Sequence, residues 1–240
     1  MSSLPFLSPT RGDARALSRS PSEGLAAAAG ATFAEHDGWM VATRFGDDAE
    51  VEELRLTETV GFWDRSRLAK FELHGTTNAL RTVLDAVGGG ITVRAQTGTR
   101  AIGAWWCPVT STRLLVVGAD GTALRAALER AVVVAEASVA VADQTCGLMA
   151  VGVAGPACRE LLAQLSAIDT RPASMPVGAF RPGSIARTPG YLLCEAPDRL
   201  LALVGWALGE YFWEVVADAA DALGGGPVGT DALRAAGADA

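Results

Sequence analysis

Half of the 240 residues are apolar and a fifth are charged, so the chain is expected to fold as a soluble protein with a sizeable core, in one domain or two small ones. Its formal net charge is −7, with 20 lysines and arginines against 27 aspartates and glutamates. This balance argues against a nucleic-acid groove, which needs a cationic field, and against attachment to an anionic membrane surface.

The cysteines and the apolar runs exclude further classes of protein and of site. The four cysteines show neither C-x-x-C spacing nor nearby histidine pairs, so the sequence predicts no metal site and no disulfide framework. Reduced thiols in a cytoplasmic protein fit this usage. Residues 1–15 lack the apolar core of a signal peptide, and the apolar run 131–142 contains Glu136 and is too short to cross a bilayer.

The N-terminal region begins with residues 1–21, which are rich in serine, proline and arginine and are predicted to form a flexible arm or a strap over the domain surface. A short alanine-rich helix is expected over 22–30, ended by a glycine. Residues 30–39 are interpreted as a glycine-flanked loop that carries one buried tryptophan, Trp39. The next predicted elements are a strand over 39–45 and a helix over 48–60.

Period-two alternation marks the stretch 61–75. Ala69, Phe71 and Leu73 alternate with charged residues, which predicts a half-buried strand. Asp64 and the serine two residues later have turn chemistry, so the simplest role of Asp64 is to cap a turn. A glycine ends the strand, and one of the three polar residues after it caps a helix over 77–87.

The rest of the chain alternates between short strands and helices. The predicted strands are 91–96, 101–107, 112–118, 132–142, 148–153, 191–194 and 200–204. The predicted helices are 122–131, 157–165 and a long amphipathic one over 206–223. Four prolines make 169–190 an irregular loop. The pattern is that of an α+β protein with split β-α-β units over antiparallel sheets.

Aromatic residues and histidines are further candidates for functional groups. Trp105 and Trp106 occupy adjacent positions of a predicted strand, so one side chain should face in and the other out. One is expected in the core, and the other against a flat ligand or in an interface. His36 and His74 are far apart and have no clear serine or cysteine partner, so no catalytic triad is predicted.

The stretch 61–75 resembles the glycine cleavage T-protein (aminomethyltransferase) family, whose segment reads G-[LIV]-F-D-x-S-H-x-x-[KR]-[IV]-x-[LIV]-x-G. Asp64, Ser66, Lys70 and Gly75 match this motif. Further segments that resemble the family are 30–39, 148–157 and 229–234. The resemblance implies an aminomethyltransferase folate-binding-like fold of tandem ferredoxin-like units with antiparallel sheets, lacking the family's C-terminal barrel. The expected division is an arm over 1–21 and two halves over 22–142 and 143–240.

The same resemblance implies that tetrahydrofolate is held in a central hole for one-carbon or amine chemistry. The residues expected to bind it are Trp39, Asp64, Trp106, Tyr191, Glu195 and Arg234. Glu195 is the candidate for gripping the pterin, whereas Arg234 is foremost a surface charge and secondly a group for phosphate or carboxylate. Ala101 and Ile102 stand at the position of the family's catalytic acidic pair. Because neither can handle a proton, no catalytic residue is assigned.

The C-terminal half looks closer to the gamma subunit of heterotetrameric sarcosine oxidase, near 180–183 and in the helix 206–223. That resemblance implies the same fold without folate chemistry, packed against catalytic partners. Three functions stay open: a protein that binds folate or another planar molecule, a non-catalytic gamma-like subunit of a sarcosine or amine oxidase, and a stand-alone biosynthetic enzyme with a repurposed pocket. The expected partners are a small-molecule ligand and protein subunits or a homo-oligomer, with neither nucleic acid nor membrane.

Overall fold

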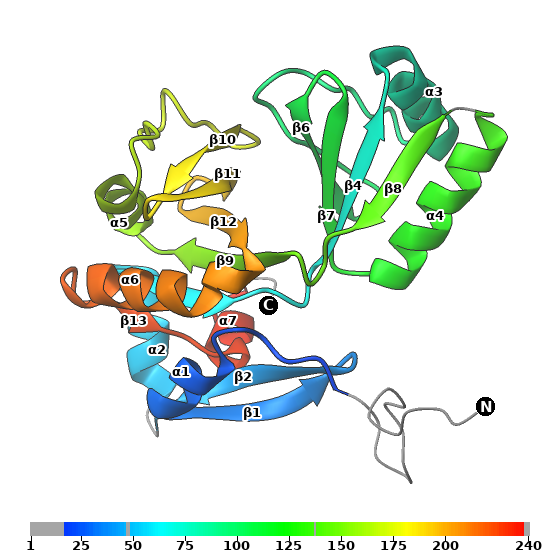
Figure 1. The fold of residues 1–240 in the computed structure, drawn as a ribbon. Coiled ribbons are helices and arrows are strands. Elements are labelled where there is room, and N and C mark those ends of the chain that lie inside the picture. The colour runs from blue at the N-terminus through cyan, green and yellow to red at the C-terminus, as the bar shows by residue number, and fades with distance from the viewer. Residues whose placement is uncertain (1–16, 47–48, 137, 238–240) are drawn as a thin grey trace, which may run out of the picture.

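The protein, seen here as a computed structural model that describes residues 17–46, 49–136 and 138–237, is built on three sheets (Figure 1). The first sheet is a hairpin of β1 (Ala31–His36) and β2 (Trp39–Phe45). The second has the strand order β10 (Phe180–Ile185), β11 (Thr188–Ala196), β12 (Arg199–Gly205), β9 (Leu148–Ala154), β3 (Gly61–Asp64), β13 (Gly226–Pro227). The third has the order β5 (Thr99–Ala101), β6 (Ala104–Thr110), β7 (Arg113–Gly118), β4 (Ala69–Gly75), β8 (Val139–Asp143). All pairs are antiparallel except β3 with β13.

Helices cover the outer faces of the two larger sheets (Figure 1). The five-stranded sheet carries α3 (Thr77–Val87) and α4 (Gly121–Val134), and the six-stranded sheet carries α5 (Cys158–Leu165) and α6 (Gly209–Asp221). The helices that pack around the hairpin are α1 (Glu23–Ala28), α2 (Ala49–Glu58) and α7 (Thr230–Ala235). A 3₁₀ turn, η2 (Trp206–Leu208), leads into α6.

The core is layered, because both larger sheets are buried on both faces. Trp106 packs with α3 and α4 on one face of the five-stranded sheet, and Trp105 packs on the other face against residues of the six-stranded sheet such as Phe180 and Leu201. Neighbouring strand residues do point to opposite faces. The expectation that one of these indoles faces outward is wrong, since the second face is covered by the other sheet.

Capping side chains set where α3 and α4 begin. The hydroxyl of Thr76 accepts a hydrogen bond from the backbone N–H of Ala79 at 3.2 Å, and the carboxylate of Asp120 accepts one from Ala123 at 2.8 Å. Each satisfies one of the amides that the first turn of a helix leaves unpaired. Helix α3 ends at Val87, and its C-cap is Gly88, whose φ of +84° favours glycine. The predicted bounds of α3 and β2 are confirmed to the residue.

Several predicted elements are wrong. Residues 91–96 form no strand, and within them Arg94 makes only an isolated bridge, to Thr97. The strand predicted over 132–142 is also wrong at its start, because α4 continues to Val134 and β8 begins at Val139. The alanine and valine run 131–142 suits either structure, which is why its sequence did not separate them. The supposed loop 30–39 contains β1, and β3 precedes the turn at Asp64.

The proline-rich segment 169–190 is also wrongly predicted in its second half, which contains β10 and the start of β11. Pro182 lies in β10, an edge strand, where a missing N–H removes no ladder bond from the sheet interior. The long helix predicted over 206–223 begins instead with η2 and ends at Asp221.

The segment before residue 65 packs in space with the segment after residue 147. Strand β3 pairs with β9 and β13, and the buried carboxylate of Glu52 accepts hydrogen bonds at 2.6 Å from the amides of both Phe45 and Gly229. The predicted division of the chain into halves 22–142 and 143–240 stays a prediction. No described helix has both the length and the apolar character needed to cross a membrane.

Candidate functional site

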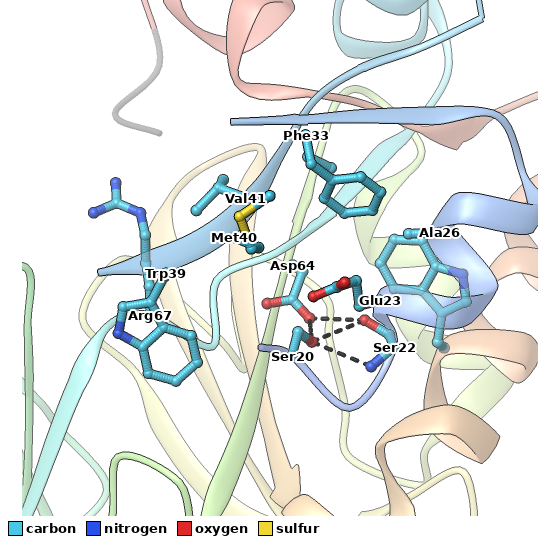
Figure 2. Close-up of a pocket in the computed structure, with 12 residues that line it drawn as sticks. Ser20, Ser22, Glu23, Ala26, Phe33, Trp39, Met40, Val41, Asp64 and Arg67 are labelled. Carbon is cyan, nitrogen blue, oxygen red and sulfur yellow. Dashed lines mark hydrogen bonds between the residues drawn. The ribbon is translucent and has the colours of Figure 1, made fainter. Parts of the chain in front are cut away.

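Asp64 ends β3 and holds two parts of the chain together. Its Oδ1 accepts a hydrogen bond from the Ser66 amide at 2.7 Å, which is the predicted turn cap. Its Oδ2 accepts hydrogen bonds from the hydroxyls of Ser22, at 2.8 Å, and of Ser20. Figure 2 shows both serines converging on the carboxylate from the segment just before α1. Both oxygens of Asp64 are thus engaged by the chain itself.

The cavity beside Asp64 is small. It has a volume of about 20 Å³ and is lined by residues of the hairpin, of α1 and of α6. A cavity of roughly 10–15 Å³ holds one water molecule, so this one has room for about one. Trp39 lines it and packs edge-on against Trp206, with 6.2 Å between ring centroids.

Glu195 is buried in an ion-pair cluster on the inner face of the six-stranded sheet. Its side chain is 4% exposed and accepts a hydrogen bond from Arg65, while the Nε of Arg199 lies 3.7 Å from it. The guanidinium of Arg65 also lies over the ring of Trp63 at 5.8 Å. The Nε atoms of both arginines and the indole N–H of Trp63 are buried without hydrogen-bond partners among the described residues. Glu195 is therefore neutralised from within the chain.

The charges of Arg67 and Arg234 are close enough to affect each other. Burial lowers the pKa of Arg67 from its usual value, the nearby Asp37 opposes this, and the positive charges of Arg65 and Arg234 lower it further. Arg234, on α7, is paired with Asp231 at 3.4 Å. The sequence motif pointed to Arg234 but carried no signal for Arg65, the residue that engages Glu195.

The two remaining predicted site residues lie elsewhere. Trp106 is fully buried, and its indole N–H donates to the Ala101 carbonyl at 3.0 Å. Tyr191 stacks on Phe180 at 5.3 Å, and burial raises the pKa of its hydroxyl. Ile102 is half exposed at the β5–β6 turn. Of the six residues, the structure brings Trp39 and Asp64 to one cavity, whereas Glu195 pairs with Arg65 and Arg199, and Arg234 pairs with Asp231.

Tetrahydrofolate does not fit at Asp64 and Glu195, the two predicted carboxylates that would hold it. Small-molecule sites measure about 300–1,000 Å³ and present polar groups aimed into the pocket. Here the space at Asp64 takes one water, the Asp64 oxygens are occupied by serines, and Glu195 is sealed by Arg65. Within the described ranges, no three His, Cys, Asp or Glu side chains are grouped so that they could hold a metal ion.

Lys70 is a buried residue whose environment the sequence did not reveal. Its Nζ donates to the Ser66 carbonyl at 2.8 Å, and burial lowers the pKa of the amine to about 8. Two open clefts lie further out. One, of about 760 Å³, runs between the tip of the hairpin and α4 and is lined by the predicted site residue Trp39. The other, of about 800 Å³, lies between α3 and the β6–β7 turn.

The chain is similar to known proteins at two levels, a family model and solved structures. A family model described as the sarcosine oxidase, gamma subunit family matches residues 81–222. No curated protein matches the chain. Among solved structures, a chain of the heterotetrameric sarcosine oxidase from Corynebacterium sp. U-96, in complex with pyrrole 2-carboxylate, is similar with a TM-score of 0.64 and 18% identity, covering 84% of this chain and 94% of that one.

A second solved structure is the glycine cleavage system aminomethyltransferase T from Bartonella henselae, with a TM-score of 0.70 and 15% identity. The match covers 90% of this chain but only 60% of that one. These likenesses establish the α+β folate-binding-like fold with its antiparallel sheets, as predicted. The described residues form no closed barrel.

Proposed function

The chain belongs to the sarcosine oxidase gamma subunit family, and on that premise we propose that it is a non-catalytic subunit of a multi-subunit sarcosine or amine oxidase. The observation that carries the proposal is the family match over residues 81–222. The matched solved chain belongs to a heterotetramer and is covered over 94% of its length, so this chain has the size of one such subunit. The proposed setting is a cytoplasmic assembly.

The chemistry of the candidate site supports a role without catalysis. A general base must reach a proton at hydrogen-bond distance, but the oxygens of Asp64 are engaged by serine hydroxyls and those of Glu195 by arginines. These carboxylates instead bind other segments of the chain, through the serines before α1 and through Arg65. At Asp64 and Glu195, tetrahydrofolate for transferase activity in one-carbon metabolism lacks both room and free polar partners. The third possibility, a stand-alone enzyme, is disfavoured for the same reason.

Co-expression with the other subunits of its own oxidase tests the proposal. We expect the chain to elute with the flavin-bearing subunits in a fixed ratio and to show no oxidase activity when purified alone. We expect tetrahydrofolate to change neither its tryptophan fluorescence nor its melting temperature. If the chain elutes as a separate monomer or homodimer while the other subunits assemble and turn over without it, the proposal is wrong. A folate-dependent rise in melting temperature would instead favour the folate-binding alternative.

A further inference from the structure

Three N–H groups on the inner face of the six-stranded sheet are buried without a partner. They are the indole Nε1 of Trp63 and the guanidinium Nε atoms of Arg65 and Arg199, none of which has a hydrogen-bond acceptor among the described residues. Trp63 is 3% exposed, and the side chain of Arg65 is 10% exposed. Native proteins pair nearly all of their buried donors, so three such groups in one place indicate an acceptor that the chain does not supply.

Gly152 brings two of these donors side by side. It lies opposite Trp63 where β3 pairs with β9. A Cβ added to Gly152 would lie 2.6 Å from the Cε2 atom of Trp63 and 2.8 Å from the Cδ atom of Arg65, so both side chains close over the bare glycine backbone. Each of those carbons is bonded to an unpaired nitrogen, Nε1 in the indole and Nε in the guanidinium. The two donors are therefore neighbours on the same face of the sheet.

The third donor, on Arg199, comes to the same face from β12. Arg199 lies opposite Ala154 of β9, which is two positions after the partner of Trp63, so both side chains point to one face. The two arginines also meet at one atom. The Oε2 of Glu195 accepts a hydrogen bond from Arg65 and lies 3.7 Å from the Nε of Arg199. The three donors thus border one small region.

The charge of this region is not balanced. In the described part of the chain, Glu195 is the one carboxylate within ion-pair distance of Arg65 or Arg199, so two guanidinium groups share a single negative charge. An unpaired charge that is removed from water destabilises a protein, and Arg65 is almost fully buried. An acceptor that itself carries one negative charge would satisfy the N–H groups and balance the excess.

We propose that Trp63, Arg65 and Arg199 form a binding site for a small monocarboxylate anion, of the size of formate or acetate. Its oxygens accept the hydrogen bonds that the three nitrogens lack, and those from the guanidinium groups are charge-assisted. The side chain of Arg199 is 25% exposed, so the anion reaches the site along this residue. The site goes beyond the proposed subunit role and does not depend on it.

Water and inorganic phosphate are the rival occupants. A water molecule accepts hydrogen bonds from buried N–H groups but leaves the excess positive charge in place. Phosphate is largely a dianion at neutral pH, against an excess of one charge, and it is bulkier than a planar carboxylate in a region that Trp63 and Arg65 enclose. A monocarboxylate matches both the charge and the planar geometry of the guanidinium groups.

Formate titration of the full chain, isotope-labelled at the nitrogens of its six indoles, tests the site by NMR. Ionic strength is held constant with chloride, which is the reference anion. The indole resonance of Trp63, assigned from Trp63→Phe, should shift downfield in a saturable manner as its N–H gains an acceptor. The resonance of Trp106 is the internal control and should stay in place, because its N–H already donates to the Ala101 carbonyl.

Two arginine variants locate the binding. Arg199→Gln keeps the pair between Arg65 and Glu195 and should weaken formate binding about tenfold or more, because it removes one charged donor. The matched control is Arg171→Gln, on a side chain that is 81% exposed, and it should stay within about twofold of the wild type. The melting temperature gives a second readout that needs no assignment: formate should raise it in the wild type and leave that of Arg199→Gln unchanged.

Each outcome decides for or against the site. Saturable formate binding that is lost in Arg199→Gln and kept in Arg171→Gln supports it. A Trp63 resonance that responds to formate no more than to chloride overturns the proposal and assigns the region to water. Phosphate that shifts this resonance at lower concentrations than formate overturns the monocarboxylate as the ligand. Equal formate affinity in folded Arg199→Gln and in the wild type also overturns the proposal.

Discussion

Lys70 is the one lysine of the chain, and its side chain is fully buried. It matched a family motif in the sequence, but the alternation of β4 placed it on the polar side of a half-buried strand. The structure buries that side too, because the five-stranded sheet faces the six-stranded one. The sequence therefore identified the residue and its strand, while its burial depended on a sheet contributed mostly by residues more than 70 positions later.

The buried amine predicts a defined pH dependence of stability. The pKa of Lys70 is about 8 in the folded protein and 10.5 in the unfolded chain, so between these values the unfolded chain binds more protons. The free energy of unfolding contributed by this group therefore rises with pH across that window, by up to about 3 kcal/mol, and is constant below pH 8.

Urea unfolding from pH 7.5 to 10.5 checks this in the wild type and in Lys70→Met. We expect the stability difference, wild type minus variant, to grow with pH across the window. The other ionisable groups are the same in both proteins, so their contributions cancel in the difference. A difference that stays flat would show that the amine is charged and solvated at its usual pKa.

At the scale of elements, the sequence predicted the bounds of helices and strands correctly where capping residues or glycines mark their ends. The N-cap threonine and the glycines after Val87 bounded α3 correctly, and alternation located β4. The failures are segments whose structure depends on distant neighbours. Strand β3 is only four residues long and exists because β9 and β13 pair with it, and β10 tolerates Pro182 because it lies at an edge.

Removal of the α4 cap should have a measurable local cost. In Asp120→Ala the amide of Ala123 loses its acceptor, which should lower the free energy of unfolding by about 1 kcal/mol. Asp120→Ser keeps a capping oxygen and should recover most of the loss. Urea unfolding of the three proteins measures both effects. Equal losses in the alanine and serine variants would mean that the carboxylate acts other than as a cap.

At the scale of the whole molecule, the cluster between the two large sheets joins them into one body. Phe180, Leu193 and Leu201 of one sheet meet Trp105 and Leu115 of the other. The contacts that decide the candidate site are equally remote, since Arg65 and Glu195 are 130 residues apart. The sequence singled out Glu195 but carried no signal for Arg65, which is why a ligand site was predicted where the structure has an ion pair.

Phe180→Ala tests how far the two sheets unfold as a unit. Its ring is fully buried, so the variant should lose about 3–5 kcal/mol, and its calorimetric transition should broaden or split as the sheets uncouple. Leu128→Ala, within the cluster under α4, should lose a comparable amount while keeping one sharp transition. A single sharp transition in both variants would place the coupling elsewhere, for example in the Arg65–Glu195 pair.

The position of β3 has a consequence for how the protein is made. The strand is synthesised before its neighbours on either side, which come from residues 148–154 and 226–227, and the Glu52 carboxylate accepts a hydrogen bond from the still later Gly229. The hydrogen bond between Glu52 and Gly229 thus cannot form until the chain has been extended by the 177 positions that separate these residues. Nascent chains stalled before residue 226 should remain sensitive to protease in 17–64, however well the five-stranded sheet has already formed.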